Sequence, residues 1–136
     1  GRGGLGGGGG GAGRGTVAGD AYAAGDAAGE NKAYVAGDVE GLGSRTGVMA
    51  VSGDDGIRLI DEALKKTGGK TDGDALIEAM KGMKWESPRG PISIDPETRD
   101  IVQNIYIRKV EKVDGELYNV EFETFEAVKD AGKTKK

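Results

Sequence analysis

The sequence predicts an α/β fold, and three features of the 136-residue chain indicate it. Residues 55–67 and 72–83 carry apolar side chains at helical spacing, and residues 91–125 are rich in β-branched and aromatic residues. The first 15 residues are mostly glycine, which brings no side chain to bury and cannot build a core. We therefore expect a glycine-rich tail or poorly defined segment over 1–15, a partial α/β unit over 16–128, and a solvated tail over 129–136.

The first helix of the pair is expected over 55–67. Ile57, Ile60 and Leu64 recur at i, i+3 and i+7 with Ala63 beside them, which predicts one apolar face. The sequence also places charges that suit the helix dipole, and Gly68 is suited to a C-terminal cap. The acidic residues at its start are Asp54 and Asp55, and the basic residues at its end are Lys65 and Lys66.

The second helix is expected over 72–83. Thr71 or Asp72 can cap its first turn, because a hydroxyl or carboxylate oxygen accepts from the free backbone N–H groups there. Its predicted inner face consists of Leu76, Ile77, Met80 and Met83.

Strands and a hairpin are expected over 91–125. Pro88 and Pro91 around Gly90 favour extended backbone, and "DPETRD" supplies turn residues with Pro96 in a natural turn position. Asp114-Gly115 lies between two β-rich runs, which is a strong hairpin signal. Trp85, just before this region, is expected to cover the end of a core between helix and sheet.

The segments upstream give weaker signals. Residues 30–43 show loosely helical spacing, which Gly37 and Gly41 weaken. "GVMAVSG", residues 47–53, is consistent with a short buried strand or an extended entry to the first helix.

Charge and residue usage disfavour several classes of function. The net charge is −4 and the pI is near 5.0, which disfavours general nucleic-acid binding. The chain contains no cysteine and no histidine, so thiolate or imidazole metal sites and the commonest general base are unavailable. No apolar run reaches the length of a membrane span, and no signal peptide is recognised. If the protein is exported, we expect either that its signal has been removed or that the sequence begins within a longer protein. We therefore expect no enzyme activity, no cofactor, no metal and no membrane insertion.

Three motif-like features are better explained without chemistry. Residues 1–6 satisfy G-x-G-x-x-G, but no strand precedes them and polyglycine follows. Arg2 and Arg14 among glycines permit an RGG-like nucleic-acid-binding tail only weakly, because aromatic residues are not interleaved. The acidic residues lack calcium-loop spacing, and Asp54 and Asp55 are interpreted as solvated or capping carboxylates.

The chain from residue 57 onward resembles the C-terminal portion of bacterial substrate-binding proteins of amino-acid ABC transporters, the Leu/Ile/Val-type, type I periplasmic binding proteins. The two-helix unit "EALKKTGGKTDGDALIEAMKGMKW", then "RGPISIDPETRD" and the Asp-Gly hairpin, carry this resemblance. It implies a two-lobed, Rossmann-like α/β fold with parallel sheets around a ligand cleft. The chain is long enough to cover only its C-terminal part.

The resemblance also implies a function and a location. It implies periplasmic capture of an amino acid, of branched-chain or related type, by hinge closure, and delivery to the permease of an ABC transporter. Met49 is expected to offer an apolar wall to the cleft, and Tyr22 to donate its hydroxyl or to pack at the hinge. A non-enzymatic structural or interaction module from a truncated α/β domain is the alternative.

Overall fold

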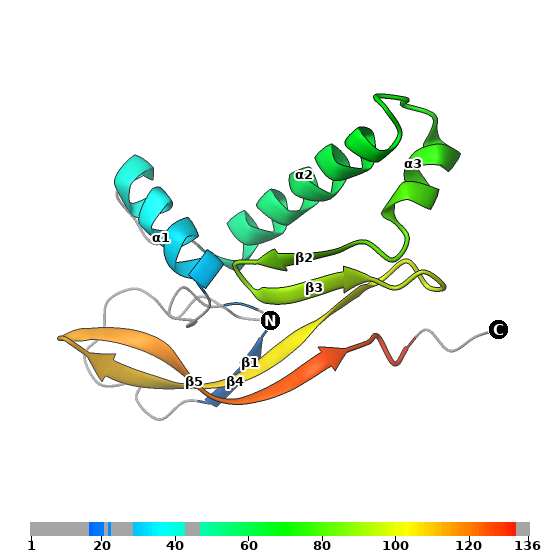
Figure 1. Cartoon of the computed structure of the whole chain (residues 1–136). Helices are drawn as coiled ribbons and strands as arrows, with labels where there is room; N and C mark the ends of the chain where they lie inside the picture. Colours follow the sequence, from blue (N-terminus) through cyan, green and yellow to red (C-terminus); the bar gives the residue numbers. More distant parts are fainter. Residues whose placement is uncertain (1–16, 21, 23–28, 43–46, 133–136) are drawn as a thin grey trace.

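The computed structural model describes residues 17–20, 22, 29–42 and 47–132. Helices α2 and α3 lie above the short strands β2 and β3, and the long β4–β5 hairpin extends on the other side of these strands (Figure 1). The predicted tail over 1–15 lies outside the described residues. The elements in chain order are β1 (Val17–Asp20), α1 (Gly29–Leu42), α2 (Val48–Lys66), α3 (Gly73–Met80), β2 (Lys84–Ser87), β3 (Gly90–Ile94), β4 (Ile101–Val113) and β5 (Glu116–Val128).

Strand β4 organises the sheet because it pairs with β1, β3 and β5, while β2 pairs with β3. All four of these strand pairs are antiparallel. The parallel sheets that the resemblance implies are therefore not formed by the described strands. The helix over Gly29–Leu42 agrees with the loosely helical spacing upstream. None of the helices in the described ranges is long and apolar enough to cross a membrane.

Helix α2 begins earlier than the sequence predicts. Residues 47–53 were expected to be extended, but Val48 to Gly53 form its first turns. Gly53 and Gly56 weaken helix propensity, yet Val51 is completely buried, and this tertiary packing outweighs the propensity. Asp54 and Asp55 therefore lie in the second turn and do not mark the helix start.

The buried face of α2 is not the predicted apolar face. Val51, Asp55 and Ala63 are buried, whereas Ile57 and Ile60, which belong to the predicted apolar face, are 69% and 47% exposed. Ala63 permits close approach of the helix to the core. The core groups Ala63, Met83 and Ile94 with the half-buried Leu59, Leu76, Ala79, Met80 and Trp85.

The predicted helix caps are confirmed. After α2, the N–H of Gly69 donates to the carbonyl of Leu64 (2.9 Å) and that of Gly68 to Lys65 (3.2 Å), with Gly68 at φ +66°. This is a Schellman motif, and it ends the helix where glycine was expected to end it. At α3, Asp72 Oδ2 accepts from the N–H of Ala75 (3.0 Å).

Helix α3 is shorter than the predicted range of 72–83. It ends at Met80, and Met83 lies beyond it, buried where the chain enters β2. The N–H of Gly82 donates to the carbonyl of Ile94 (2.9 Å), and Gly82 has φ +70°. This glycine therefore turns the chain from the helix to the sheet before the helix can extend to Met83.

The strand region agrees with the prediction and adds one strand. β3, β4 and β5 occupy the predicted range, and Asp114 and Gly115 turn the hairpin with φ of +49° and +88°. Strand β2 was not predicted. Trp85 lies on it and packs against the core between helix and sheet, as expected.

Candidate functional site

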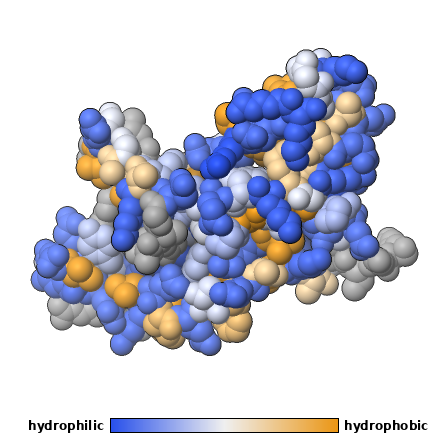
Figure 2. Space-filling model, viewed as in Figure 1, coloured by the Kyte–Doolittle hydropathy of each residue, from blue (hydrophilic) through white to orange (hydrophobic). Residues whose placement is uncertain are grey.

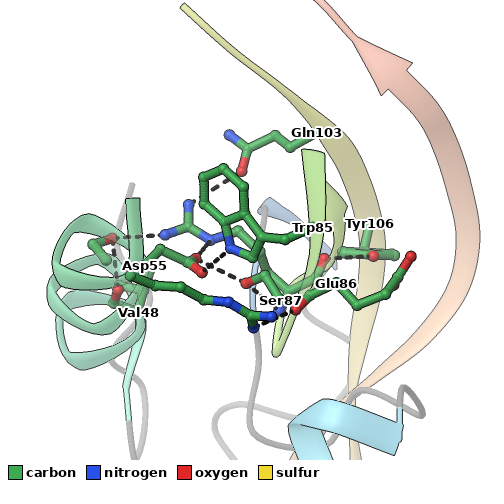
Figure 3. Close-up of polar contacts among 10 residues, drawn as sticks. Val48, Asp55, Trp85, Glu86, Ser87, Gln103 and Tyr106 are labelled. Atoms are coloured by element: carbon green, nitrogen blue, oxygen red, sulfur yellow. Dashed lines mark hydrogen bonds and ion pairs between the residues drawn. The ribbon is translucent and has the colours of Figure 1, made fainter. Parts of the chain in front are cut away.

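A buried ion pair joins α2 to the turn between β2 and β3 (Figure 3). Nε of Arg89 lies 2.8 Å from Oδ2 of Asp55, and the two side chains are 9% and 6% exposed. The Nε–H group is not aligned for a hydrogen bond, so this contact is an ion pair held by charge. Asp55 comes from the second turn of α2, and Arg89 from the two-residue turn that Pro88 begins.

The Asp55 carboxylate accepts two further hydrogen bonds from β2. Trp85 donates from Nε1 to Oδ1 (3.1 Å), and Ser87 donates from Oγ to Oδ2 (2.8 Å). Trp85 and Ser87 are two residues apart on β2, so both side chains point to the same face of the sheet, toward α2. Charge-assisted hydrogen bonds of this kind offset part of the cost of burying a carboxylate.

The Arg89 guanidinium is held from two other elements. Nη1 donates to Oε1 of Gln103 on β4 (3.1 Å), and Nη2 donates to Oγ of Ser52 on α2 (3.3 Å). The backbone carbonyl of Arg89 accepts from the hydroxyl of Tyr106 (2.7 Å). Helix α2 and strand β4 therefore meet at the side chain of Arg89, and β4 also bonds to its backbone.

This cluster is suited to holding structure and not to reacting. Each charge is neutralised by its partner, and the Asp55 oxygens and the Arg89 Nη groups bond to neighbouring side chains. A general base or nucleophile needs an available lone pair facing a substrate, and the Asp55 carboxylate faces Arg89, Trp85 and Ser87. What the arrangement does is fix the N-terminal half of α2 against the β2–β3 hairpin.

This cluster was not predicted from the sequence. Asp55 was interpreted as a solvated or capping carboxylate, which is wrong, because its side chain is buried between α2 and the β2–β3 hairpin. Arg89 was not singled out. The available signal was an arginine between two prolines at the tip of a hairpin, since an arginine that is buried there needs a partner of opposite charge.

The two predicted ligand-site residues occupy different environments. Met49 lies in the first turn of α2 and is 83% exposed, so its side chain is available as an apolar surface. Tyr22 follows β1 and is 3% exposed. Their roles toward a ligand remain predictions.

An open groove of about 430 Å³ lies over strands β2, β3 and β4. Lys84 and Glu86 bring opposite charges to its wall, so it does not present one sign of charge to a ligand. Within the described part of the chain, no group of three or more His, Cys, Asp or Glu residues is placed to hold a metal ion. The groove is lined by Lys84, Trp85, Glu86, Pro91, Ile92, Ser93, Val102, Asn104 and Ala127.

Comparison with known proteins relates this architecture to solute-binding proteins. The chain is 69% identical to the solute-binding protein of an ABC transporter from Rhodopseudomonas palustris BisB5, which was solved in complex with 3,4-dihydroxybenzoic acid. The two structures match with a TM-score of 0.88, and the match covers 90% of this chain and 34% of that one. A second solute-binding protein, from Rhodopseudomonas palustris HaA2 in complex with p-hydroxybenzoic acid, is 49% identical, with a TM-score of 0.82 over 88% of this chain and 33% of that one.

A curated relative gives a different ligand in its name. The Leu/Ile/Val-binding protein homolog 6 of Brucella abortus (strain 2308) is 54% identical over 79 residues, which are 57% of this chain and 20% of the relative. The chain thus spans about a fifth of that protein and a third of the solved ones. Residues 3–116 match the periplasmic binding protein family, and the chain belongs to that family.

Proposed function

We propose that this chain is part of the solute-binding component of an ABC transporter whose ligand is an aromatic carboxylic acid of the hydroxybenzoate type. The observation that carries the proposal is the 69% identity and 0.88 TM-score to a protein solved with 3,4-dihydroxybenzoic acid. The 49% identical protein solved with p-hydroxybenzoic acid supports the same ligand class. Closely similar chains with the same fold conserve a site more often than they exchange it for another chemistry.

The composition of the chain is consistent with binding without catalysis. Reversible capture needs hydrogen-bond donors and apolar walls, and it does not need a nucleophile. The chain contains no cysteine or histidine, and its buried Asp55–Arg89 pair is occupied by structural contacts. In this proposal the protein acts in the periplasm and delivers its ligand to a permease, as the family resemblance implies.

Met49 and Tyr22 are the residues of this chain that we propose to reach the ligand. A thioether side chain is flexible and makes favourable contacts with aromatic rings, so the exposed Met49 suits a benzoate ring. The phenol of Tyr22 suits a carboxylate or hydroxyl group of the ligand. The Asp55–Arg89 pair would act indirectly, by fixing the helix turn that carries Met49.

An amino-acid ligand is the second candidate. It is favoured by the name of the 54% identical Brucella relative, a Leu/Ile/Val-binding protein homolog. The aromatic acid is preferred because the match to the R. palustris protein is both closer in sequence and longer, covering 90% of this chain against 57%.

Isothermal titration and thermal-shift measurements separate these ligands. The protein for the test is a chimera in which this chain replaces the matching third of the R. palustris BisB5 protein; this chain alone is run in parallel. If the site is intact, ligand at a hundredfold excess over Kd stabilises the fold by about 2.7 kcal/mol. Stabilisation of the chimera by 3,4-dihydroxybenzoate or 4-hydroxybenzoate, and not by leucine, isoleucine or valine, supports the proposal.

Other outcomes contradict it in distinct ways. Stabilisation by the branched-chain amino acids alone favours the second candidate. A folded chimera that responds to none of these ligands favours the structural or interaction module. The variant Met49→Ala should weaken binding in the chimera by roughly tenfold, as the loss of a well-packed side chain costs about 1–2 kcal/mol.

A further inference from the structure

The turn between β4 and β5 joins an aspartate to a glycine, and these two residues can react with each other. The backbone nitrogen of the glycine can attack the side-chain carboxyl carbon of the aspartate, because the bond between them closes an unstrained five-membered ring. Glycine hinders this attack least, since it has no side chain beside its nitrogen. The sequence contains three such pairs, which are Asp55-Gly56, Asp72-Gly73 and Asp114-Gly115.

The end of the β4–β5 hairpin, which carries the third pair, stands in solvent. All residues over 111–116 are exposed, whereas Val110 is buried. The turn lies at the left end of the view in Figure 1, and mostly hydrophilic residues form the surface there in Figure 2. Val113 and Glu116 form the last pair of the hairpin ladder. A strand end without tertiary cover opens far more often than the core of a sheet.

Both reacting groups are available at this turn. Within the described ranges, no residue forms a hydrogen bond or ion pair with the Asp114 carboxylate. The Gly115 N–H takes no part in the backbone hydrogen bonds of the described turns and loops. The space where a Cβ of Gly115 would lie is open, so nothing crowds the approach to its nitrogen. Asp114 has φ +49°, in the left-handed region that an L-residue holds at a cost, so the turn relaxes when it opens.

The other two pairs are protected to different degrees. Gly56 lies inside α2, where its N–H belongs to the helix ladder, and the Asp55 carboxylate is held by Arg89, Trp85 and Ser87. Asp72 is exposed, but its Oδ2 accepts from the first turn of α3, which keeps the carboxylate away from the nitrogen of the next residue. The pair in the hairpin turn is therefore the most reactive, the pair at the helix cap follows, and the pair inside α2 is the least reactive.

We propose that Asp114-Gly115 is a site of spontaneous isomerisation, at which the chain modifies its own backbone. The nitrogen of Gly115 bonds to Cγ of Asp114, and the hydroxyl of the carboxyl group leaves as water with the proton of that nitrogen. One water molecule then opens the succinimide ring. Attack at Cγ restores aspartate, and attack at the backbone carbonyl carbon leaves the chain running through the side chain, as isoaspartate. The net reaction is an isomerisation that needs no oxidant and leaves the mass unchanged.

The product alters the turn, because isoaspartate adds one methylene group to the backbone between the two strands. A two-residue hairpin turn requires positive φ at both central residues, and the longer backbone no longer meets that requirement. The Val113–Glu116 pair then loses its register, and the end of the hairpin opens. This inference does not depend on the proposed function or on which ligand is bound.

Ageing of this chain at neutral pH and physiological temperature for several weeks tests the proposal. Trypsin releases the three pairs in separate peptides, over 46–58, 71–81 and 113–129, and electron-transfer fragmentation in a mass spectrometer identifies isoaspartate in each. We expect isoaspartate to accumulate at Asp114 at least about tenfold faster than at Asp72, and more slowly still at Asp55. In concentrated urea the three rates should agree within about threefold, because the reacting pair is the same and the fold is lost.

Two results would overturn the inference. Isomerisation of Asp55 or Asp72 in the folded chain as fast as that of Asp114 would show that the fold does not select the site. An unchanged Asp114 in the folded chain, with all three pairs reacting in urea, would show that the turn protects its own pair.

Asp114→Glu is the matched control, since it keeps the negative charge but would need a less favourable six-membered ring. Circular dichroism confirms that the variant is folded. We expect its peptide over 113–129 to remain unmodified after ageing, which supports the assignment to Asp114. A modified peptide in this variant would assign the change to Asn119, the remaining residue of that peptide able to form a succinimide, and would contradict the proposal.

Discussion

Arg89 and Asp55 place opposite charges in the interface between a helix and a hairpin, where apolar residues of similar size would also pack. Such pairs contribute little net stability, because the cost of removing the two charges from water offsets most of the attraction between them. Their value is geometric, since the guanidinium bonds to Gln103 and Ser52 at once and thereby fixes their relative positions.

The substitution Arg89→Met tests this reading at the level of one residue. It leaves the Asp55 carboxylate buried without its cation, and we expect a loss of about 3–5 kcal/mol in the free energy of unfolding. Urea denaturation followed by circular dichroism measures it. Asp55→Leu in addition should recover most of the loss, because the uncompensated charge is then gone.

Arg58→Met provides the control for Arg89→Met. Arg58 also donates a hydrogen bond, from Nη1 to the carbonyl of Glu86 (2.9 Å), but it lies on the exposed side of α2. We expect a change below about 1 kcal/mol there. Equal losses at the two arginines would contradict the special role of the buried pair.

Gly90 is required for a different reason. Its φ is +94°, and a Cβ there would lie 2.3 Å from the hydroxyl oxygen of Tyr106, which donates to the carbonyl of Arg89. Gly90→Ala should therefore destabilise the protein by more than the roughly 1 kcal/mol expected of Gly115→Ala, where φ is +88° but space is open. Thermal unfolding of both variants measures the two losses of stability, and losses of equal size would refute the steric argument.

Residues whose role is local were predicted from the sequence, and residues whose partners are distant in the chain were not. Gly68, Asp72 and Gly115 act within a few positions of themselves, so their neighbours in sequence were enough to predict them. Asp55 and Arg89 are 34 positions apart, and no local pattern shows that they meet.

The sequence predicted the existence of the helices more reliably than the face that each helix turns toward the sheet. The helices around 55–67 and 72–83 exist, but Ile57 and Ile60, which were predicted to form one apolar face, are exposed. Hydrophobic periodicity finds an apolar row without saying which neighbour covers it. Where a helix has two apolar rows, only the tertiary arrangement decides which one meets the sheet.

We expect Asp95, in the turn between β3 and β4, to make the stability of the protein depend on pH. The pKa of Asp95 is lowered from 3.8 to about 2, first by the hydrogen bond from Lys129 (2.7 Å) and then by the N–H groups of Glu97 and Thr98. A lowered pKa in the folded state contributes stability above the unfolded value, and this contribution is lost as pH falls from about 4 toward 2. The stability difference between the parent protein and Asp95→Asn should therefore shrink over that interval.

Acid titrations of the two proteins, monitored by circular dichroism, measure this difference. Lys129→Met should reduce the effect without abolishing it, because both backbone N–H groups remain on Oδ1. A stability difference that stays constant from pH 4 to pH 2 would contradict the assignment. Lys129, the first residue of the predicted tail, thus ties the end of β5 to this turn.

At the scale of the whole molecule, charge predicts which partners are disfavoured. The net charge of −4 supplies no cationic excess for phosphate backbones, so we expect the chain to pass through a heparin column at physiological salt. Retention that falls as salt is raised would instead support an RGG-like role for Arg2 and Arg14, which lie outside the described residues. The matched test is Arg2→Ala with Arg14→Ala, which should change nothing if the prediction holds.

The sequence alone determined the class of this protein: local caps, turn residues and helical spacing identified an α/β unit, and "RGPISIDPETRD" with its flanking elements identified the family. These signals depend on neighbours within a few residues, and they survive in a chain that spans a third of its relatives. Only the tertiary structure decided that Asp55 is buried against Arg89 and that the Ile57–Ile60 row faces away from the sheet. Both depend on which distant segments come together, and that is set by the packing of whole elements.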